Sequence, residues 1–405
     1  MRFFIIDDNE DVAKLLTPLL QRAGHTVSYN QSPTQALKEV PALRPDCILL
    51  DLMMPEMDGF ELCKRFREMH DLAGTKIIIL SAKSYDFDKR RAKQLGADGF
   101  IVKPFDVKTF IGEVDKIFTK KLSLSYWGTR GTLPVPGQGS LKYGGNTSCV
   151  SIQVDDEPLI IFDAGTGIKK LSDHLMTTGI KRLTAKIFIS HPHWDHINAF
   201  PFFGALFMVG NEIEVLGPAH SGTSMRSVIS SQMDDIYFPV TIREFGARVF
   251  FRDLHEESLA VGKIQVDTLL LNHPGNCLGY RATYNGKRIC YITDNEIFPP
   301  GSPNHDPDFE KRLVNFIHGT DILIADSTYL DEEYPKKTGW GHSCISEVVR
   351  IADLAQVKSL HLFHHDPDQN DAMIDHKLEQ ATRKLNQMGS SVECVCPAEG
   401  SQFVL

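Results

Sequence analysis

The chain has 405 residues, of which 42% are hydrophobic and 23% charged, a composition typical of globular proteins and a length sufficient for two or three domains. The net charge of −9 excludes a general attraction to nucleic acid or anionic membranes, although it is compatible with a local basic patch. No apolar run is long enough to cross a bilayer, and the N-terminus becomes acidic at Asp7 and Asp8, too early for a signal peptide. We therefore expect a cytoplasmic protein whose eight cysteines stay reduced.

The first 121 residues alternate short apolar runs with amphipathic runs. The apolar runs predict strands at residues 3–6, 27–29, 47–50, 76–80 and 99–102. The amphipathic runs predict helices near residues 11–23, 34–42, 59–69, 86–95 and 107–120. This alternation predicts a parallel sheet covered by helices on both faces, with its functional residues at the carboxyl ends of the strands.

Charged and polar side chains follow four of these strands. They are Asp7 and Asp8, Asp51, Ser81 and Lys103. Three crowded carboxylates repel one another unless a cation neutralises them, and Mg²⁺ with oxygen ligands suits this role. With the ion on one side and Lys103 on the other, Asp51 can attack a phosphoryl donor as a carboxylate nucleophile.

Four motifs in this region resemble those of response-regulator receiver domains: IDDN at residues 6–9, LDLMMPEMDG at 50–59, SAK at 81–83 and KPF at 103–105. The resemblance implies that Asp51 is the phospho-acceptor and that a sensor histidine kinase is the phosphodonor. It also implies roles for the surrounding residues: Asp7, Asp8 and the Met53 carbonyl hold Mg²⁺, Ser81 reaches the phosphoryl oxygen, Lys103 pairs with it, and Phe100 is the aromatic switch residue. No acid and no lysine of the pattern is missing.

The joint to the second part of the chain is short. The last predicted helix ends at Lys120 and Lys121, and a strand-like run begins at residue 122 without a Gly/Ser or Pro spacer. We therefore divide the chain into residues 1–121 and 122–405 and expect close contact between the two domains.

The densest functional motif of the second part is HPHWDH at residues 191–196, which follows an apolar run at 185–189 and precedes a helix-like run at 197–203. Imidazole nitrogens and carboxylate oxygens suit zinc and similar divalent ions. His191 and His193 alternate along one segment and can share an ion, whereas Asp195 and His196 point elsewhere and can hold a second one. Only two of the sixteen histidines precede residue 122, so histidine-based metal chemistry belongs to this domain.

Three further candidate ligands stand where a predicted strand meets a loop. They are His273, Asp294 and His364, with His365 as the alternative to His364, which is preferred because it directly ends its strand. A glycine-rich loop at residues 163–167 could cradle phosphate. Tight turns explain its glycines better, with Asp163 pinning a loop under the metal site.

The order of these residues resembles the metallo-β-lactamase superfamily, whose fold stacks two sheets between helices. The expected fold class is therefore α/β, a flavodoxin-like (βα)5 receiver followed by an αββα domain. The resemblance implies two divalent ions, zinc in the first place with manganese or iron as alternatives. In this scheme His191, His193 and His273 hold one ion, Asp195, His196 and His364 hold the other, and Asp294 bridges them.

Details within the superfamily favour hydrolysis of phosphodiesters. His193 is not glutamate, which argues against the diiron oxygen-reducing branch, and Asp294 is not cysteine, which argues against true β-lactamases. Residues 341–343, Gly-His-Ser, resemble the His-Ser motif of ribonuclease Z and related phosphodiesterases, and they precede a predicted helix at 345–355. The likeness implies that His342 protonates the leaving oxygen, with Asp195 and Asp294 completing the catalytic centre. A compatible structural explanation makes Ser343 the helix cap and His342 its neighbour.

The sequence thus predicts a response regulator whose output is a dinuclear-metal phosphodiesterase for a cyclic nucleotide or small diester, controlled by phosphorylation at Asp51. The first alternative is a hydrolase of thioesters or lactones. A ribonuclease is less favoured, since the net charge is negative and no basic tRNA-holding insertion is apparent, and the full ligand set disfavours a non-enzymatic module. The sequence does not decide whether the protein forms a homodimer. Residues 221–240 fit equally a lid over the site or a helix packed on the core.

Overall fold

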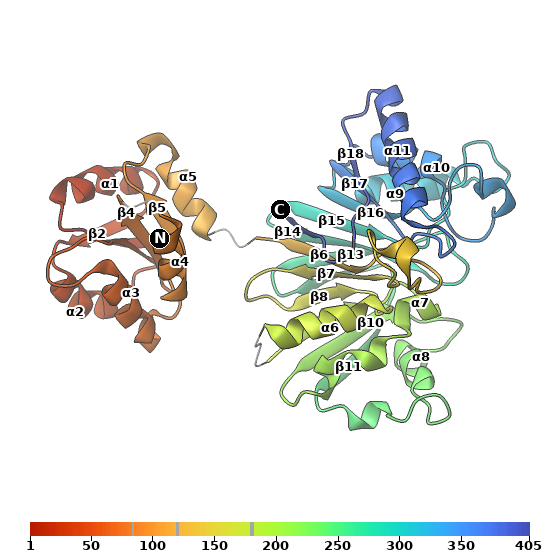
Figure 1. Ribbon diagram of the computed structural model, residues 1–405, viewed down its shortest axis with the longest axis horizontal. Coiled ribbons are helices and arrows are strands. Elements are labelled where there is room, and N and C mark those ends of the chain that lie inside the picture. Colours follow the sequence, from red (N-terminus) through yellow and green to blue (C-terminus); the bar gives the residue numbers. More distant parts are fainter. Residues whose placement is uncertain (83–84, 119–120, 179–181) are drawn as a thin grey trace. The chain divides into compact units, whose positions relative to one another are not determined.

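A computed structural model describes residues 1–82, 85–118, 121–178 and 182–405. The chain forms two compact units, Met1–Lys120 and Lys121–Leu405 (Figure 1). The predicted end of the first domain's last helix, at Lys120, lies outside the described residues. None of the helices in the described part of the chain is long and apolar enough to cross a membrane.

The first unit is a five-stranded parallel sheet with the strand order β2-β1-β3-β4-β5. Its strands are β1 (Arg2–Ile6), β2 (Thr26–Asn30), β3 (Cys47–Asp51), β4 (Lys76–Ser81) and β5 (Gly99–Val102). Its helices are α1 (Glu10–Arg22), α2 (Pro33–Leu43), α3 (Gly59–Glu68), α4 (Asp86–Gln94) and α5 (Val107–Phe118). Every residue of β3 is buried because apolar clusters pack on both faces of the sheet. The predicted (βα)5 architecture is confirmed.

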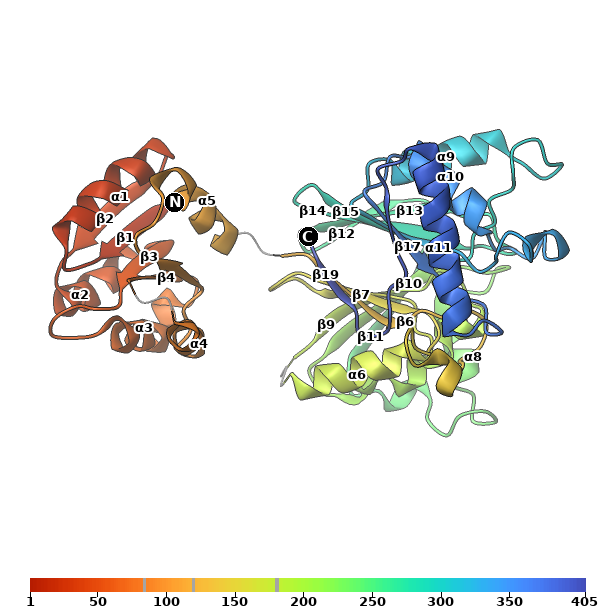
Figure 2. The ribbon, with the colours of Figure 1, turned by 45° about the horizontal axis from the view of Figure 1, so that its top comes forward.

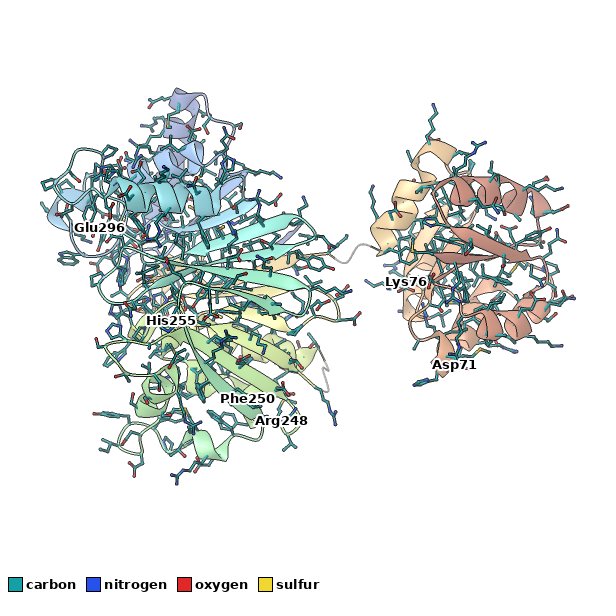
Figure 3. The ribbon with its side chains drawn as sticks, turned by 180° about the vertical axis from the view of Figure 1, so that it is seen from behind. Asp71, Lys76, Arg248, Phe250, His255 and Glu296 are labelled. Carbon is teal, nitrogen blue, oxygen red and sulfur yellow. The ribbon has the colours of Figure 1, made fainter. Side chains whose placement is uncertain are left out.

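The second unit contains two seven-stranded sheets. The first sheet has the order β11-β10-β9-β8-β7-β6-β19, with β6 (Ser123–Gly128), β7 (Cys149–Gln153), β8 (Leu159–Phe162), β9 (Thr184–Phe188), β10 (Glu212–Pro218), β11 (Arg248–Leu254) and β19 (Gln402–Val404). Figure 3 shows Arg248 and Phe250 on β11, at the edge of this sheet. The second sheet has the order β12 to β18, with β12 (Ser258–Val261), β13 (Ile264–Leu270), β14 (Leu278–Tyr284), β15 (Lys287–Ile292), β16 (Ile322–Asp326), β17 (Ser359–Phe363) and β18 (Glu393–Val395).

Helices cover the outer face of each sheet (Figures 1 and 2). On the first sheet they are α6 (Gly167–Thr177) and α8 (Met225–Gln232), and on the second α9 (Pro307–Ile317), α10 (Ile345–Leu354) and α11 (Asp371–Met388). Between the sheets lies an apolar core rich in aromatic rings, among which Phe162 stacks on Tyr291 with centroids 5.1 Å apart. This αββα layering confirms the predicted fold.

Strand direction explains why functional loops converge at one edge. In the first sheet β8, β9, β10 and β11 run parallel, and in the second β15, β16 and β17 do so. Strand β13 has the direction of β15, since both pair antiparallel with β14. The loops that follow these strands therefore leave from carboxyl ends, where sites of α/β sheets form.

The helix predicted at residues 197–203 is wrong in its position and type. A short helix, α7 (Trp194–Ile197), already begins inside the histidine motif, and a separate 3-10 turn follows at Phe200–Phe202. Pro201 lies in that turn, and its ring and missing amide hydrogen oppose a continuous α-helix.

Residues 221–240 pack on the core. Helix α8 buries Met225 and Ile229 against the first sheet, and Met233 is buried directly after it. Tyr237, beyond the helix, is exposed. The packing of α8 therefore favours the core-helix explanation of this segment over a lid.

Candidate metal centre

Seven histidine and aspartate side chains meet at the edge described above. One group comprises His191, His193, His273 and Asp294, a second Asp195, His196 and His364, and a third, which overlaps both, Asp294, His342 and His364. In each group, one potential ligand atom from every residue lies within 4.8 Å of the others. The histidine motif follows β9, whereas His273, Asp294 and His364 follow β13, β15 and β17. The structure thus brings together all seven residues that the sequence singled out.

Asp294 spans the first two groups. Its Oδ1 lies 3.1 Å from His364 Nε2 and 3.2 Å from His196 Nε2, and its Oδ2 lies 3.6 Å from His191 Nε2. One carboxylate oxygen therefore faces each group, which is the geometry required of a bridging ligand.

The imidazoles are oriented by partners outside the cluster. His191 Nδ1 lies 3.0 Å from Ser190 Oγ, His196 Nδ1 2.7 Å from Asp163 Oδ2, His273 Nδ1 2.9 Å from the Gly341 carbonyl, and His364 Nδ1 3.1 Å from Thr328 Oγ1. Each ring thereby directs Nε2 inward, whereas His193 places Nδ1 3.3 Å from His273 Nε2. Two of the inward atoms, His191 Nε2 and His196 Nε2, are buried and accept no hydrogen bond within the described ranges. Buried polar atoms without partners are costly, so this arrangement fits divalent ions.

The protonation states of five of the seven candidate ligands suit metal binding. The exception with a shifted pKa is His196, where burial lowers the pKa but the carboxylates of Asp195, Asp294 and Asp163 outweigh it and raise the pKa well above its usual value. Burial holds the pKa of His191 well below its usual value and also lowers the pKa values of His193 and His273, so these rings are neutral. Burial alone would raise the pKa of Asp294, but the neighbouring imidazoles outweigh it and hold that pKa well below the ordinary range. The same balance lowers the pKa of Asp195. Neutral imidazoles and ionised carboxylates are the forms that coordinate cations.

Three of the loop residues adopt left-handed backbone conformations. They are Asp163 (φ 59°), Asp294 (φ 46°) and His364 (φ 61°). Non-glycine residues in this region cost of the order of 1–3 kcal/mol each and cluster at functional sites. Each of the three directly follows a strand or lies within two residues of its end, so the turn redirects the chain at the cluster.

The carboxylate of Asp163 holds the histidine motif in place through hydrogen bonds. It accepts hydrogen bonds from the Ser190 amide at 2.7 Å, the Ser190 hydroxyl at 2.9 Å, His196 Nδ1 at 2.7 Å and the Tyr291 hydroxyl at 2.8 Å. This bonding confirms the prediction that Asp163 holds a loop under the site.

Replacing Asp163 with asparagine should lower divalent-metal affinity about 10- to 100-fold while the fold persists, the usual effect of losing a partner that orients a metal-binding histidine. The amide would place a donor against the Ser190 amide or His196 Nδ1. Titration against a chromophoric chelator measures the affinity. Asp155→Asn, at an exposed position before β8, is the control. Equal affinity in the Asp163 variant and the wild type would contradict this role.

His342 lies beside the cluster. Its Nδ1 is 2.8 Å from Asp326 Oδ2 and 3.9 Å from Asp294 Oδ2. Burial lowers the pKa of His342, but Asp326 outweighs this effect and raises the pKa to about 9. His342 is therefore protonated at neutral pH, and it lines the same cavity of about 590 Å³ as five of the seven ligand candidates.

The alternative structural explanation, in which Ser343 caps the following helix, is wrong. Cys344 occupies the N-cap position of α10 and makes no side-chain cap hydrogen bond. The Ser343 hydroxyl instead donates to the Asn295 carbonyl at 2.5 Å and accepts from the Ile297 amide at 3.0 Å. Ser343 therefore ties the His342 loop to the loop that follows β15.

His365 does not join the cluster. It is buried, and its Nδ1 lies 3.4 Å from the ammonium of Lys377. Lys377 also donates to the Ser327 and Thr328 carbonyls at 2.7 and 2.8 Å, which ties α11 to the loop after β16. The chain thus directs His364 into the centre and His365 away from it.

Two important residues were not predicted from the sequence. Asp326 ends the apolar strand β16 just as Asp294 follows β15, a signal that was available in the pattern. Glu296 accepts hydrogen bonds from the Tyr334 hydroxyl and the Gly339 and Gly341 amides, partners that no local pattern indicates.

In the first unit, four of the predicted residues are in contact. Lys103 Nζ donates to Asp51 Oδ1 at 2.5 Å and to Asp7 Oδ2 at 2.6 Å, and Asp51 Oδ2 accepts from the Met53 amide at 2.5 Å. Burial lowers the pKa of Lys103, but these two carboxylates outweigh it and raise the pKa overall. The ammonium therefore neutralises part of the charge of the paired acids.

The other receiver residues lie as follows. Ser81 is buried at the end of β4, and Phe100 packs partly buried against the core. Asp8 is exposed. Magnesium binding by this unit stays a prediction.

Comparisons with known proteins agree with this division. A model of the response regulator receiver domain matches residues 3–115, and a model of the beta-lactamase superfamily domain matches residues 159–365, about half of the chain. The transcriptional regulatory protein PhoP of Bacillus subtilis is 34% identical over 119 residues, which cover 29% of this chain and 49% of PhoP. The response regulator MtrA of Mycobacterium tuberculosis is 37% identical over 113 residues, 28% of this chain and 48% of MtrA. The chain thus spans about half the length of these curated relatives.

The second unit has a structural counterpart. The metallo-beta-lactamase fold protein YhfI of Bacillus subtilis superposes with a TM-score of 0.50 at 17% identity, covering 70% of this chain and all of YhfI. All seven residues of the His/Asp cluster lie within the range that the beta-lactamase superfamily model matches. The chain belongs to the beta-lactamase superfamily and carries a response regulator receiver domain at its N-terminal side.

Proposed function

We propose that the second unit is a dinuclear-metal phosphodiesterase and that the first unit regulates it. The observation that carries the proposal is the carboxylate of Asp294 between two ligand groups, with the His342–Asp326 pair beside them. Bound divalent ions, zinc in the first place, would supply Lewis-acid polarisation and an activated water.

Electrostatics favours an anionic substrate. Two divalent cations would exceed the charge of the Asp195 and Asp294 carboxylates, so the loaded centre would be positive. A phosphodiester brings a negative charge to this place, whereas a thioester or lactone is neutral.

The chain's own residues support departure of an alkoxide. His342 is held protonated by Asp326, which also orients the ring. A protonated imidazole beside the cluster can donate its proton to a leaving oxygen of the substrate. Asp163, Ser190 and Thr328 hold the ligand imidazoles in place, so that few groups must reorganise during the reaction.

A substrate panel tests the proposal. Protein loaded with Zn²⁺ or Mn²⁺ should hydrolyse bis(p-nitrophenyl) phosphate and cyclic nucleotides faster than an acyl thioester or a lactone, and a chelator should abolish the reaction. A structured RNA in the same panel covers the ribonuclease alternative. Faster hydrolysis of the thioester or the lactone than of every diester would overturn the proposal.

Regulation through Asp51 gives a separate prediction. Its carboxylate contacts Lys103 and the Met53 amide, so a phosphoryl group on it would rearrange the end of β3 and β5. With Mg²⁺ and acetyl phosphate, we expect the turnover of the wild type to change and that of Asp51→Asn to stay constant. Asp71→Asn is the control, because Asp71 is an exposed aspartate of the same unit (Figure 3). The same rate for all three proteins with and without phosphodonor would refute this control mechanism.

A further inference from the structure

We infer that Trp340 is a specificity-determining residue that stacks on a planar ring of the substrate, which makes nucleobase-bearing phosphodiesters the substrate class of this site. The inference rests on the proposed phosphodiesterase function and adds to it what the non-reacting part of the substrate is.

Trp340 is exposed at the cavity of the metal centre. Its side chain is 61% exposed, and it lines the cavity together with His193 and His342. Within residues 1–82, 85–118, 121–178 and 182–405, the indole has no ring partner and its N–H has no hydrogen bond. An indole face left open beside a reaction centre is available for stacking on a base, a contact that tolerates any base because each has a π-face.

The backbone on both sides of Trp340 is held firmly. The buried carboxylate of Glu296 (labelled in Figure 3) accepts from the Gly339 amide at 2.7 Å and the Gly341 amide at 2.8 Å. The Trp340 amide donates to the Lys337 carbonyl at 3.2 Å. Trp340 thus has an open side chain on an anchored backbone, so that little ordering cost remains when a ring binds it.

The loop that carries Trp340 also packs closely against His273, a candidate metal ligand. Gly341 has a φ of +89°, and a Cβ at this position would lie 2.3 Å from His273 Nδ1. The Gly341 carbonyl accepts the hydrogen bond from that same ring nitrogen. Short backbone contacts therefore set the position of Trp340 relative to the ligand cluster. A substrate whose base stacks on Trp340 would thus have its phosphate at a fixed distance from that base.

The charges at the cavity favour a small substrate over a nucleic-acid strand. Lys337 is the one lysine among the described lining residues, and its ammonium is 2.9 Å from Asp366 Oδ2 and 4.5 Å from the Tyr329 ring centroid. This lysine is therefore already paired, whereas strand-binding grooves need surplus positive charge along the backbone path. Asp366 and Asp368 line the same cavity and offer acceptors for sugar hydroxyls.

Two substrates with the same leaving group provide the test. Thymidine 5′-(p-nitrophenyl phosphate) and methyl p-nitrophenyl phosphate differ in the nucleoside alone. We expect the wild type to prefer the thymidine ester. Trp340→Ala should lower kcat/KM for this ester about 5- to 100-fold, chiefly through KM, the range expected for losing a base–aromatic stack, and should leave the methyl ester unchanged. Trp340→Phe should retain most of the preference.

A binding measurement separates this inference from the proposed function. Adenosine 5′-monophosphate should quench the tryptophan fluorescence of the wild type and of Trp194→Phe, whose indole is 82% exposed and outside the described cavity lining, but not that of Trp340→Phe. If the metal-loaded wild type hydrolysed neither ester, the proposed phosphodiesterase function would be refuted. The quenching measurement alone would then show whether Trp340 binds a base. Equal kcat/KM for both esters in the wild type, an equal loss of both in Trp340→Ala, or unchanged quenching in Trp340→Phe would overturn the inference.

Discussion

Replacing Asp294 with asparagine should remove divalent ions from both ligand groups and lower kcat/KM for a phosphodiester by more than about 100-fold. Residues that only orient a metal ligand already contribute about 10- to 100-fold, and Asp294 contacts both groups directly. Its two oxygens lie 3.1 Å from His364 Nε2 and 3.6 Å from His191 Nε2. An amide of the same size removes the charge and replaces one acceptor with a donor, so neither group keeps its full ligand set.

Metal analysis by mass spectrometry of the purified variants measures this effect. The matched control is Asp321→Asn, because Asp321 is a buried carboxylate that precedes β16 at its opposite end and accepts from the Arg288 amide. The control should keep the metal content of the wild type. Two ions per chain in the Asp294 variant would show that this carboxylate does not bridge.

Replacing His342 with asparagine should lower kcat about 100- to 10,000-fold on a diester with an alkoxide leaving group, the range for losing a general acid. The loss should be much smaller with p-nitrophenolate, which leaves without protonation. The metal content should stay that of the wild type, because His342 lies beside the ligand groups and its Nδ1 is paired with Asp326.

Comparing the two leaving groups distinguishes chemistry from folding damage. A structural defect would lower both rates alike, and His376→Asn on α11, at an exposed position, should change neither. Full activity of the His342 variant on the alkyl diester would exclude the proton-donor role.

The receiver could be predicted almost completely from the sequence because its information is local. Each strand is a short apolar run, and the acids or the lysine stand at its end or directly after it, as with Asp51 at the end of β3. The helices begin at polar caps that can be recognised in the sequence, such as Asn9 and Asp58, whose side chains accept from amides of the first turn.

The metal centre could be predicted as far as its ligands follow strands. His191 and His193 alternate along one segment and fall in one group, whereas Asp195 and His196, which lie in the short helix α7, fall in another. What escaped prediction depends on contacts between distant segments. Glu296 meets Gly339 and Gly341 more than forty residues later, and neither periodicity nor capping rules describe such a contact.

The errors at residues 197–203 and at Ser343 have a similar cause. Apolar spacing predicted a helix where Pro201 and the turn into the cluster required two short pieces. Ser343 has the residue type of a cap, but tertiary partners, the Asn295 carbonyl and the Ile297 amide, engage its hydroxyl first. In both places tertiary structure overrides a local preference.

Anomalous scattering from crystals grown with Zn²⁺ tests the central claim most directly. The account predicts two strong peaks per chain in the second unit, one within reach of His191, His193 and His273 and one within reach of Asp195, His196 and His364, with Asp294 between them. A map without peaks at these side chains, or with a single peak that Asp294 does not contact, would contradict the dinuclear centre on which the proposed hydrolysis depends.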